Sequence, residues 1–166
     1  TLSRFDEYSP DQEKNFTSLN LTALISSLVT PLQTLAKHYA VALKFTTSSQ
    51  TEINIFSNAT ILSQALTNII KNSIVYNKPN GTVEITTAQN ENKTIITSVD
   101  TGIGMTQDEI QKVFDRFYRA NKSRSSQISG SGLGLSIAHS SLQYLGGTVD
   151  IISTPGKGTT ITLTLS

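Results

Sequence analysis

Residues 68–135 constrain the fold more strongly than any other part of this 166-residue chain. Four short motifs follow one another there: NIIKN (68–72), DTGIGM (100–105), FDRFYR (114–119) and GSGLGL (130–135). Glycine allows tight turns and a close approach of backbone to a ligand. Any one of these strings alone is weak evidence, because glycine-rich hexapeptides also occur by chance and as ordinary turns, so their order and spacing together carry the information.

Composition excludes several classes of protein. The formal net charge is +1 and charged residues make up 15% of the chain, so no basic surface for nucleic acid or an anionic membrane is expected. The chain has no cysteine, which excludes disulfides, thiolate metal sites and cysteine nucleophiles. No apolar run approaches the ~20 residues of a membrane helix. The length fits one domain, and a start at Thr1 indicates a piece of a longer protein.

Two helices are predicted before residue 80. Asn20 is a plausible N-cap for the first, whose apolar residues follow the spacing of one helix face, and Pro31 is expected to kink or interrupt it. The second begins near Asn58. Its core-facing stripe consists of Leu62, Ala65, Leu66, Ile69 and Ser73.

Alternating apolar residues predict three hairpins. They pair residues 41–45 with 53–56, 83–87 with 95–99, and 148–153 with 160–165. With a further helix after Gly134, these elements predict an α/β fold. We expect a two-layer sandwich in which a mixed, mainly antiparallel sheet of about five or more strands packs on three helices.

Asn68, Asn72 and Tyr76 are spaced by four residues and form a second stripe on the predicted helix. Carboxamides are poor choices inside a helix, so two in register beside a core stripe favour a polar ligand. Taken alone, the stripe is more typical of a solvated face.

Asp100 ends a predicted strand, immediately before Gly102 and Gly104. A carboxylate is thereby placed where the backbone can approach a ligand, although an aspartate that merely caps a turn fits the same pattern. Thr106 and Glu109 form a capping box for the next helix, whose apolar residues include Phe114 and Phe117.

Gly130, Gly132 and Gly134 open the last predicted helix, after a polar, serine-rich segment. Free N–H groups and the helix dipole favour an anion at such a start. The string is not a Walker A loop, since no Gly-Lys-Ser/Thr follows, and it lacks the βαβ frame of a dinucleotide fingerprint.

The four motifs together resemble the catalytic ATP-binding domain of sensor histidine kinases, in the ATPase superfamily that includes gyrase and MutL. NIIKN is similar to the N box, DTGIGM to the first glycine box, FDRFYR to the F box and GSGLGL to the second glycine box. The resemblance covers residues 20–166 and implies the Bergerat-type fold. It predicts a catalytic domain at residues 19–166, with residues 1–18 as the end of a dimerisation helix and a linker.

The resemblance assigns roles at the adenine and metal. Asn72 would bind Mg²⁺ and bridge it to the phosphates of ATP, with Asn68 near the γ-phosphate. Tyr76 would stack on adenine and Asp100 would accept a hydrogen bond from its exocyclic amine. Thr160 matches a threonine near an adenine-bound water, and Gly102 and Gly104 would let the backbone pass beneath the base.

The resemblance also assigns roles at the triphosphate. Tyr118 would flank the nucleotide, and Arg119 would reach the γ-phosphate and stabilise charge during transfer. A solvated surface arginine is the alternative for Arg119. Phe114 and Phe117 would anchor the lid. Main-chain N–H groups would line the phosphates at Gly130, Gly132, Leu133, Gly134 and Leu135.

Three positions depart from the family pattern. A lysine commonly precedes the stacking aromatic, and this chain has Val75, so that Lys71 or Lys78 would supply the charge or phosphate affinity would be lower. Ser73 follows the metal-binding asparagine where alanine is usual. The usual histidine before the final Gly-Gly is Leu145.

Asn68 bears on the chemistry. In the gyrase and MutL branches a glutamate at this position activates water, and without a carboxylate base water attack should be slow. This favours transfer of the γ-phosphoryl group to an imidazole of another domain. Neither His38 nor His139 lies in the sequence context of a phosphoacceptor, so both are expected to be ordinary helix residues.

The sequence therefore predicts the MgATP-binding catalytic domain of a two-component sensor histidine kinase. Its expected partners are its own histidine-bearing dimerisation domain and, through it, a response regulator, with no nucleic acid. The isolated domain is expected to be monomeric, the whole protein a homodimer, and the domain cytoplasmic in a membrane-anchored bacterial sensor. The alternatives are an ATPase that acts as a conformational clamp, with rapid turnover that Asn68→Ala abolishes, and a degenerate docking module.

Overall fold

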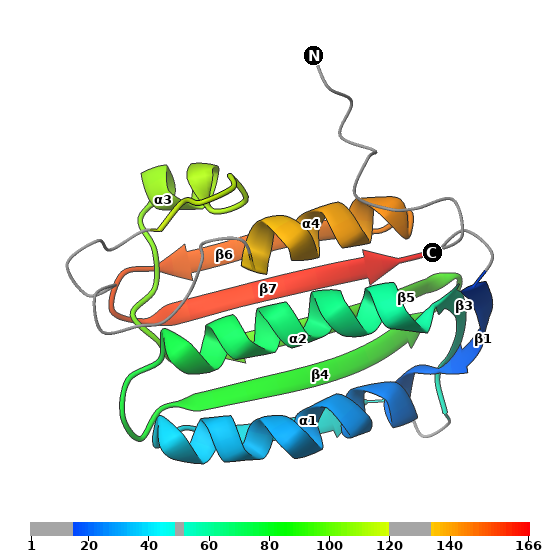
Figure 1. Ribbon diagram of the computed structural model, residues 1–166, viewed down its shortest axis with the longest axis horizontal. Helices are drawn as coiled ribbons and strands as arrows, with labels where there is room; N and C mark the ends of the chain where they lie inside the picture. The colour runs from blue at the N-terminus through cyan, green and yellow to red at the C-terminus, as the bar shows by residue number, and fades with distance from the viewer. Residues whose placement is uncertain (1–14, 49–51, 120–133) are drawn as a thin grey trace.

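A computed structural model describes residues 15–48, 52–119 and 134–166, which form two layers (Figure 1). One layer is a five-stranded sheet in the order β2-β4-β5-β7-β6. Its strands are β2 (Ala42–Thr47), β4 (Thr82–Asn90), β5 (Lys93–Asp100), β6 (Thr148–Thr154) and β7 (Gly158–Leu165). The other layer consists of α1 (Leu21–His38), α2 (Ala59–Val75) and α4 (Gly134–Tyr144), which lie on one face of the sheet (Figure 1). The predicted two-layer α/β fold is confirmed.

Side-chain caps fix where α1 and α2 begin. The Oδ1 atom of Asn20 accepts the N–H of Ala23 at 2.9 Å, and Oδ1 of Asn58 accepts the N–H of Ile61 at 3.1 Å. These bonds satisfy backbone donors that a helix start otherwise leaves unpaired. Behind the caps, the predicted stripe of α2 is buried throughout and packs between α1, α4 and the sheet.

Two of the three predicted hairpins are present, and the first is wrong. β4 pairs antiparallel with β5, and β6 with β7. β2 does not pair with residues 53–56; it pairs parallel with β4, in the register Leu43↔Val83. Alternation identifies a strand but not its neighbour, and a parallel partner requires a crossover, which α2 supplies here.

The strand β3 (Asn54–Asn58) instead pairs antiparallel with β1 (Phe16–Asn20). β1 includes residues 16–18, the last part of the segment predicted to be the end of a dimerisation helix and a linker, so these residues form a strand. Each of these short strands runs directly into the N-cap of a helix, and the N–H of Leu21 bonds to the carbonyl of Ile53 at 2.8 Å. The small sheet thereby joins the starts of α1 and α2.

Pro31 does not interrupt α1, which continues unbroken from Leu21 to His38. Proline lacks an N–H and so removes one helical hydrogen bond. Pro31 is exposed, whereas its neighbours Val29 and Leu32 are buried. Packing of the buried face therefore holds both halves of α1 in place. The helical hydrogen bond that Pro31 cannot make would lie on the solvent-exposed side.

The helix after the capping box is shorter than predicted. Both bonds of the Thr106–Glu109 box are present, but α3 (Gln107–Lys112) ends before the phenylalanines. Phe114 stacks on His139 of α4, with 4.5 Å between ring centroids. Phe117 has a φ of 62° and is 71% exposed, so of the two phenylalanines only Phe114 packs against the core.

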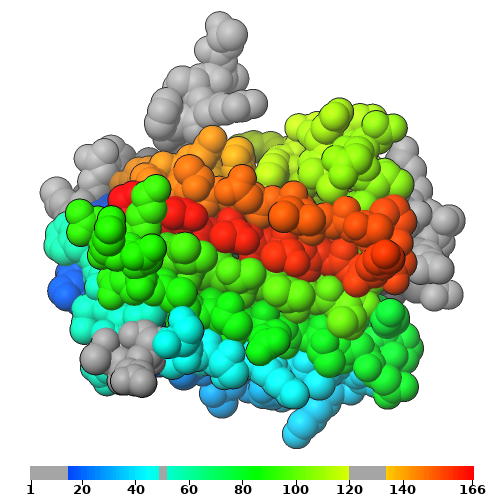
Figure 2. Space-filling view, turned by 180° about the vertical axis from the view of Figure 1, so that it is seen from behind, coloured from blue at the N-terminus to red at the C-terminus, as the bar shows by residue number. Residues whose placement is uncertain are grey.

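The face of the sheet opposite the helices has no described helix over it (Figure 2). There β7, in red, lies between β5 in green and β6 in orange. Val99, Thr160 and Ile152 form one row across these strands, because Val99 and Ile152 both pair with Thr160. Among described residues no helix is long and apolar enough to cross a membrane.

Candidate functional site

A cavity of about 510 Å³ lies between the helices and the end of the sheet. Most of the residues predicted for the site line it, although they come from separate parts of the chain. These are Asn68, Asn72, Tyr76, Asp100, Gly104, Tyr118, Arg119, Gly134 and Leu135. Gly102 and Thr160 are not among the lining residues. Gly130, Gly132 and Leu133 lie outside the described residues.

The asparagine stripe of α2 forms one wall. Asn68 and Asn72 line the cavity one turn apart, and Tyr76 follows as the C-cap of the helix. A Cβ atom placed on Gly134, the first described residue of α4, would lie 3.9 Å from Oδ1 of Asn68. The start of α4, with the N–H groups that a helix start leaves unpaired, therefore adjoins Asn68.

Asp100 lies in the opposite part of the site, at the end of β5. Its side chain is 9% exposed, and its Oδ1 accepts the N–H groups of Gly102 at 2.9 Å and Thr159 at 3.1 Å. Burial raises the pKa of this carboxyl, against the lowering effect of hydrogen bonds from Gly102, Thr159 and Ser73. The backbone thus fixes a carboxylate in the lining of the cavity.

The threonine beside Asp100 is Thr159, so the prediction of Thr160 is off by one residue. Thr159 pairs with Asp100 across β5 and β7 and lines the cavity. Side chains of a strand alternate between its faces, which places Thr160 on the open face of the sheet. Two consecutive threonines cannot be told apart by pattern alone, because the register of β7 against β5 decides between them.

The loop after Asp100 passes close to other backbone. A Cβ atom on Gly102 would lie 2.5 Å from the carbonyl oxygen of Tyr76, and the N–H of Ile103 bonds to that oxygen at 3.1 Å. The Oγ atom of Ser153 accepts the N–H of Met105 at 2.8 Å. Gly102 therefore supports the site without lining it, by letting the loop lie against the end of α2.

Replacing Gly104 by alanine is expected to destabilise the fold by about 2 kcal/mol or more. Gly104 has a φ of +65°, and a Cβ atom there would lie 2.0 Å from the carbonyl oxygen of Thr154. Gly146→Ala is the matched control, since Gly146 has a φ of +75° with no atom within 4 Å of its Cβ position. Urea unfolding of both variants measures the difference, and equal losses would contradict the close contact.

Tyr118 and Arg119 form the rim of the cavity on the side of α3. Partial burial, followed by the nearby carboxylates Glu109 and Asp108, raises the pKa of Tyr118. Tyr118 is therefore a neutral phenol at neutral pH, able to donate and accept hydrogen bonds. Arg119 adds a permanent positive charge at the same rim.

Lys71 is the lysine that the structure places at the cavity. It lines the cavity together with Val75, which lies one helical turn further along α2, whereas Lys78 is not a lining residue. Residues four apart share a helix face. Lys71 therefore occupies the position from which a cation could compensate for Val75.

If the cavity holds the ATP that the resemblance implies, Lys71→Gln is expected to weaken its binding about three- to tenfold and to leave binding of adenosine unchanged, because the lost charge would act on phosphate. Calorimetric titration of both ligands measures this. Lys78→Gln removes the same charge outside the cavity and is the control. A similar loss with adenosine would show that the effect of Lys71 does not come from phosphate.

Apolar residues complete the cavity, and the sequence did not single them out for the site. They are Leu35, Tyr39, Ile103, Met105, Val113 and Ile161. Each was interpreted as core or as a turn residue, because periodicity does not distinguish a side chain that faces another side chain from one that faces a cavity. They give the cavity lining an apolar part beside its polar residues.

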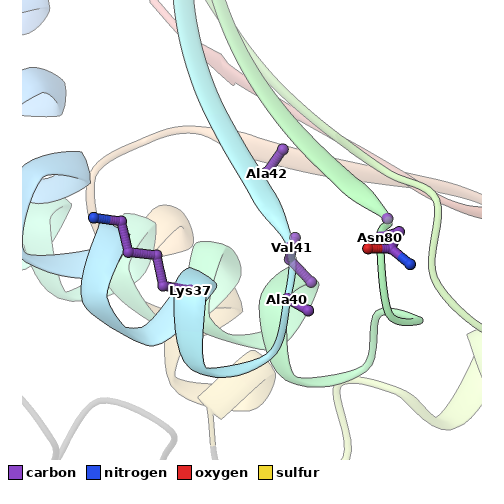
Figure 3. Close-up of a pocket in the computed structure, with 6 residues that line it drawn as sticks. Lys37, Ala40, Val41, Ala42 and Asn80 are labelled. Carbon is purple, nitrogen blue, oxygen red and sulfur yellow. The ribbon is translucent and has the colours of Figure 1, made fainter.

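A second, open hollow lies at the end of α1 (Figure 3). It is lined by Lys37, Ala40, Val41, Ala42, Asn80 and Gly81. Backbone bonds join its walls, with the N–H of Asn80 bonded to the carbonyl of Ala40 at 2.8 Å. The side chain of Lys37 points away from Asn80 (Figure 3), so no set of polar side chains converges there.

Residues 57–166 match the sequence profile of the histidine kinase-, DNA gyrase B- and HSP90-like ATPases. The chain belongs to this family. The matched range includes all the cavity-lining residues except Leu35 and Tyr39. Family membership therefore agrees with an ATP-binding role for the cavity.

The relatives that this ATPase-family chain matches are sensor histidine kinases. It is 35% identical over 164 residues to the sensor histidine kinase RppB of Synechocystis, which covers 99% of this chain and 36% of RppB. It is 43% identical over 106 residues to the sensor histidine kinase WalK of Bacillus subtilis, covering 63% of this chain and 17% of WalK. The chain thus spans about a third or less of the length of these relatives.

Solved structures show the same fold. The mycobacterial sensor histidine kinase MprB superposes with a TM-score of 0.77 at 22% identity, covering 90% of this chain and 96% of that one. The catalytic domain of the histidine kinase ThkA gives a TM-score of 0.78 at 22% identity, covering 90% and 94%. Both the sheet and its helical layer are therefore those of histidine kinase catalytic domains.

Proposed function

We propose that the cavity binds MgATP with its adenine at Tyr76 and Asp100 and its phosphates toward Asn68, Asn72 and the start of α4. The observation that carries the proposal is the polarity of the site, with a fixed carboxylate in one part and carboxamides beside a helix start in another. Asp100 suits the exocyclic amine of adenine, since an ionised carboxylate only accepts hydrogen bonds. The helix start suits an anion.

Asn72 is the proposed protein ligand of Mg²⁺. A side-chain carbonyl oxygen suits this hard cation, which usually keeps several waters and binds through few protein groups plus phosphate. In the described part of the chain, no group of three or more His, Cys, Asp or Glu side chains offers another site. Bound Mg²⁺ would neutralise charge on the phosphates.

We propose that the domain transfers the γ-phosphoryl group of ATP to a histidine nitrogen of another domain. The bond from the γ-phosphorus to the bridging oxygen breaks, ADP leaves, and a phosphorus–nitrogen bond forms. Asp100 is the only carboxylate among the cavity-lining residues that the structure describes, and it is the proposed acceptor of the adenine amine, so no further carboxylate of the described lining is left to act as a general base for water. Arg119 would stabilise the charge that develops during transfer.

The arrangement of the whole protein is part of this proposal. Residues 19–166 would be the catalytic domain, joined through residues 1–18 to a histidine-bearing dimerisation domain. The curated relatives are longer sensor kinases, which supports further domains. We propose that the whole protein is a membrane-anchored homodimer with this domain in the cytoplasm, and that it passes its phosphoryl group to a response regulator.

The test is to mix the chain with a separately expressed histidine-bearing dimerisation domain and ATP labelled at the γ-phosphate. Label should appear on the added domain as an acid-labile, alkali-stable phosphate, as expected for phosphohistidine. Replacing the acceptor histidine of that domain by glutamine should remove the label. Rapid release of inorganic phosphate by the chain alone, with no labelled protein, would instead favour the ATP-driven clamp.

Binding of the adenine moiety should weaken as the pH falls. Burial holds the pKa of Asp100 above the usual carboxyl value, and the protonated form loses an acceptor for the exocyclic amine. Affinity should therefore be full above the raised pKa and fall through it. Adenosine is the suitable ligand, because it has no titrating phosphate, and the pH dependence should be absent in Asp100→Asn.

A further inference from the structure

His139 of α4 is a residue to which the proposed reaction gives no role. Its imidazole stacks on the ring of Phe114, with 4.5 Å between the ring centroids and 16° between the ring planes. Both side chains are half-buried, and neither residue is among those that line the cavity. The stack is therefore a contact between two elements of the fold and not a part of the binding surface.

The stack joins two walls of the cavity. Phe114 directly follows Val113, which lines the cavity. His139 comes four residues after Leu135, another lining residue, and residues four apart share a helix face. The contact between Phe114 and His139 thus connects the wall that contains residues 113–119 with the wall that α4 provides.

Few other side chains anchor residues 107–119. None of the 6 residues of α3, all of which the structure describes, is buried. In the segment 113–119, Val113 and Phe114 pack against the hydrophobic core, whereas Phe117 is 71% exposed. A turn follows Phe114, in which the N–H of Tyr118 bonds to the carbonyl of Asp115 at 3.2 Å. The position of Tyr118 at the rim therefore depends on how Phe114 is held.

Histidine suits this half-buried contact. An imidazole offers an apolar face to the phenyl ring and polar nitrogen atoms to water. An aromatic pair at this separation changes an equilibrium constant by a factor of about two to ten. Such a factor is large enough to alter the position of a rim segment and too small to unfold a domain.

We propose that His139, by its stack on Phe114, is a positioning residue that keeps Tyr118 and Arg119 at the rim of the cavity, where they act on the phosphates of ATP. The inference rests on the proposed function, because it requires phosphates within reach of this rim. His139 touches no ligand itself. Loss of its ring should therefore lower the affinity for ligands that carry phosphates and leave adenosine unaffected.

His139→Ala tests the role of the ring. Calorimetric titration should show that this variant binds a non-hydrolysable ATP analogue with Mg²⁺ about three- to tenfold more weakly than the wild type and binds adenosine equally well. His139→Phe restores a flat ring without the nitrogen atoms and should recover most of the affinity for the analogue. His139→Gln keeps a polar side chain without a ring and should behave as His139→Ala does.

Phe16→Ala is the matched control. It removes a ring that contacts Tyr144, also on α4, with 6.3 Å between centroids, and neither Phe16 nor Tyr144 lines the cavity. This variant should bind both ligands as the wild type does. Thermal unfolding identifies any folding defect, and His139→Gln serves as the second variant if His139→Ala does not fold.

The route through the rim has its own test. In a chain that carries Tyr118→Phe and Arg119→Gln, the further change His139→Ala should weaken binding of the analogue by less than about twofold, since the groups that it positions are already absent. The same factor as in the wild-type background would overturn the inference. Equal weakening of the analogue and adenosine, or no recovery in His139→Phe, would also overturn it.

The wild-type chain separates this inference from the proposed function. If the wild type binds the ATP analogue with Mg²⁺ no more tightly than adenosine, the phosphate end of the proposed site fails. If the wild type gains affinity from the phosphates and both His139→Ala and His139→Gln keep that gain, only the role of His139 fails.

Discussion

Asp100→Asn is expected to weaken binding of ATP by between about tenfold and a hundredfold. A hydrogen bond to a charged acceptor contributes about 1.5–3 kcal/mol. The side-chain amide of the asparagine is a weaker acceptor, and its NH₂ group is a donor that would face the donating exocyclic amine of adenine. Asp100 is buried and held by two backbone N–H groups, so no rearrangement of the carboxylate is available to compensate. Calorimetric titration with a non-hydrolysable ATP analogue and Mg²⁺ measures the change.

Two comparisons make this result specific. Asp150→Asn removes an exposed carboxylate on β6, outside the cavity, and should bind the analogue as the wild type does. The Asp100 variant should also stay folded. Because the pKa of Asp100 is raised in the folded state, its contribution to stability falls as the pH rises through that pKa, and removing the charge should leave the unfolding temperature at neutral pH equal or higher. Unaltered binding in Asp100→Asn would contradict the adenine assignment.

Asn72→Ala is expected to remove the gain in ATP affinity that Mg²⁺ provides, with a loss of about tenfold or more in the presence of the metal. Asn72 lines the cavity beside Asn68, and its oxygen is the proposed protein ligand. Without it the metal would depend on phosphate and water alone. Titrations with the ATP analogue in Mg²⁺ and in EDTA should give the same dissociation constant for this variant.

Adenosine and a second asparagine are the controls for Asn72. Adenosine carries no phosphate, so Asn72→Ala should bind it as the wild type does. Asn90→Ala, which removes an exposed carboxamide at the end of β4, should keep the full effect of Mg²⁺. An Asn72→Ala variant that still gains affinity from Mg²⁺ would require a different metal ligand.

The sequence predicted where α1 and α2 begin and most of the residues that meet at the cavity, because local rules determine these features. The cap at Asn20, the start of a helix near Asn58 and the stripe of α2 depend on spacing within one helix, and all were confirmed. The cavity brings together residues from α2, the end of β5 and the start of α4, as the order of the four motifs indicated. For these features, chain order and local periodicity were sufficient.

The errors occurred where partners distant in sequence decide the outcome. The apolar pattern of β2 is the same whether its neighbour is β3 or β4, and the parallel pairing with β4 depends on the crossover through α2. The choice of Thr160 over Thr159 failed for a similar reason, since the register of β7 against β5 decides which of them faces Asp100. α1 tolerates Pro31 because Pro31 lies on the exposed face, while the residues before and after it in the helix pack against the core.

The alternatives of a hydrolase and a docking module make different demands on this site. A hydrolase needs a base near the γ-phosphate, and that position is Asn68, which adjoins Gly134 at the start of α4. A degenerate module need not keep a buried, backbone-bonded carboxylate that is costly to desolvate, yet Asp100 is one. Both observations favour a nucleotide-binding kinase domain.

Titration of the wild-type chain with a non-hydrolysable ATP analogue, with and without Mg²⁺, tests the central claim most directly. We expect one saturable site per chain, an affinity that rises when Mg²⁺ is added, and competition by adenosine. No saturable binding in Mg²⁺, with the chain shown to be folded by its thermal unfolding, would contradict the assignment of this cavity to MgATP.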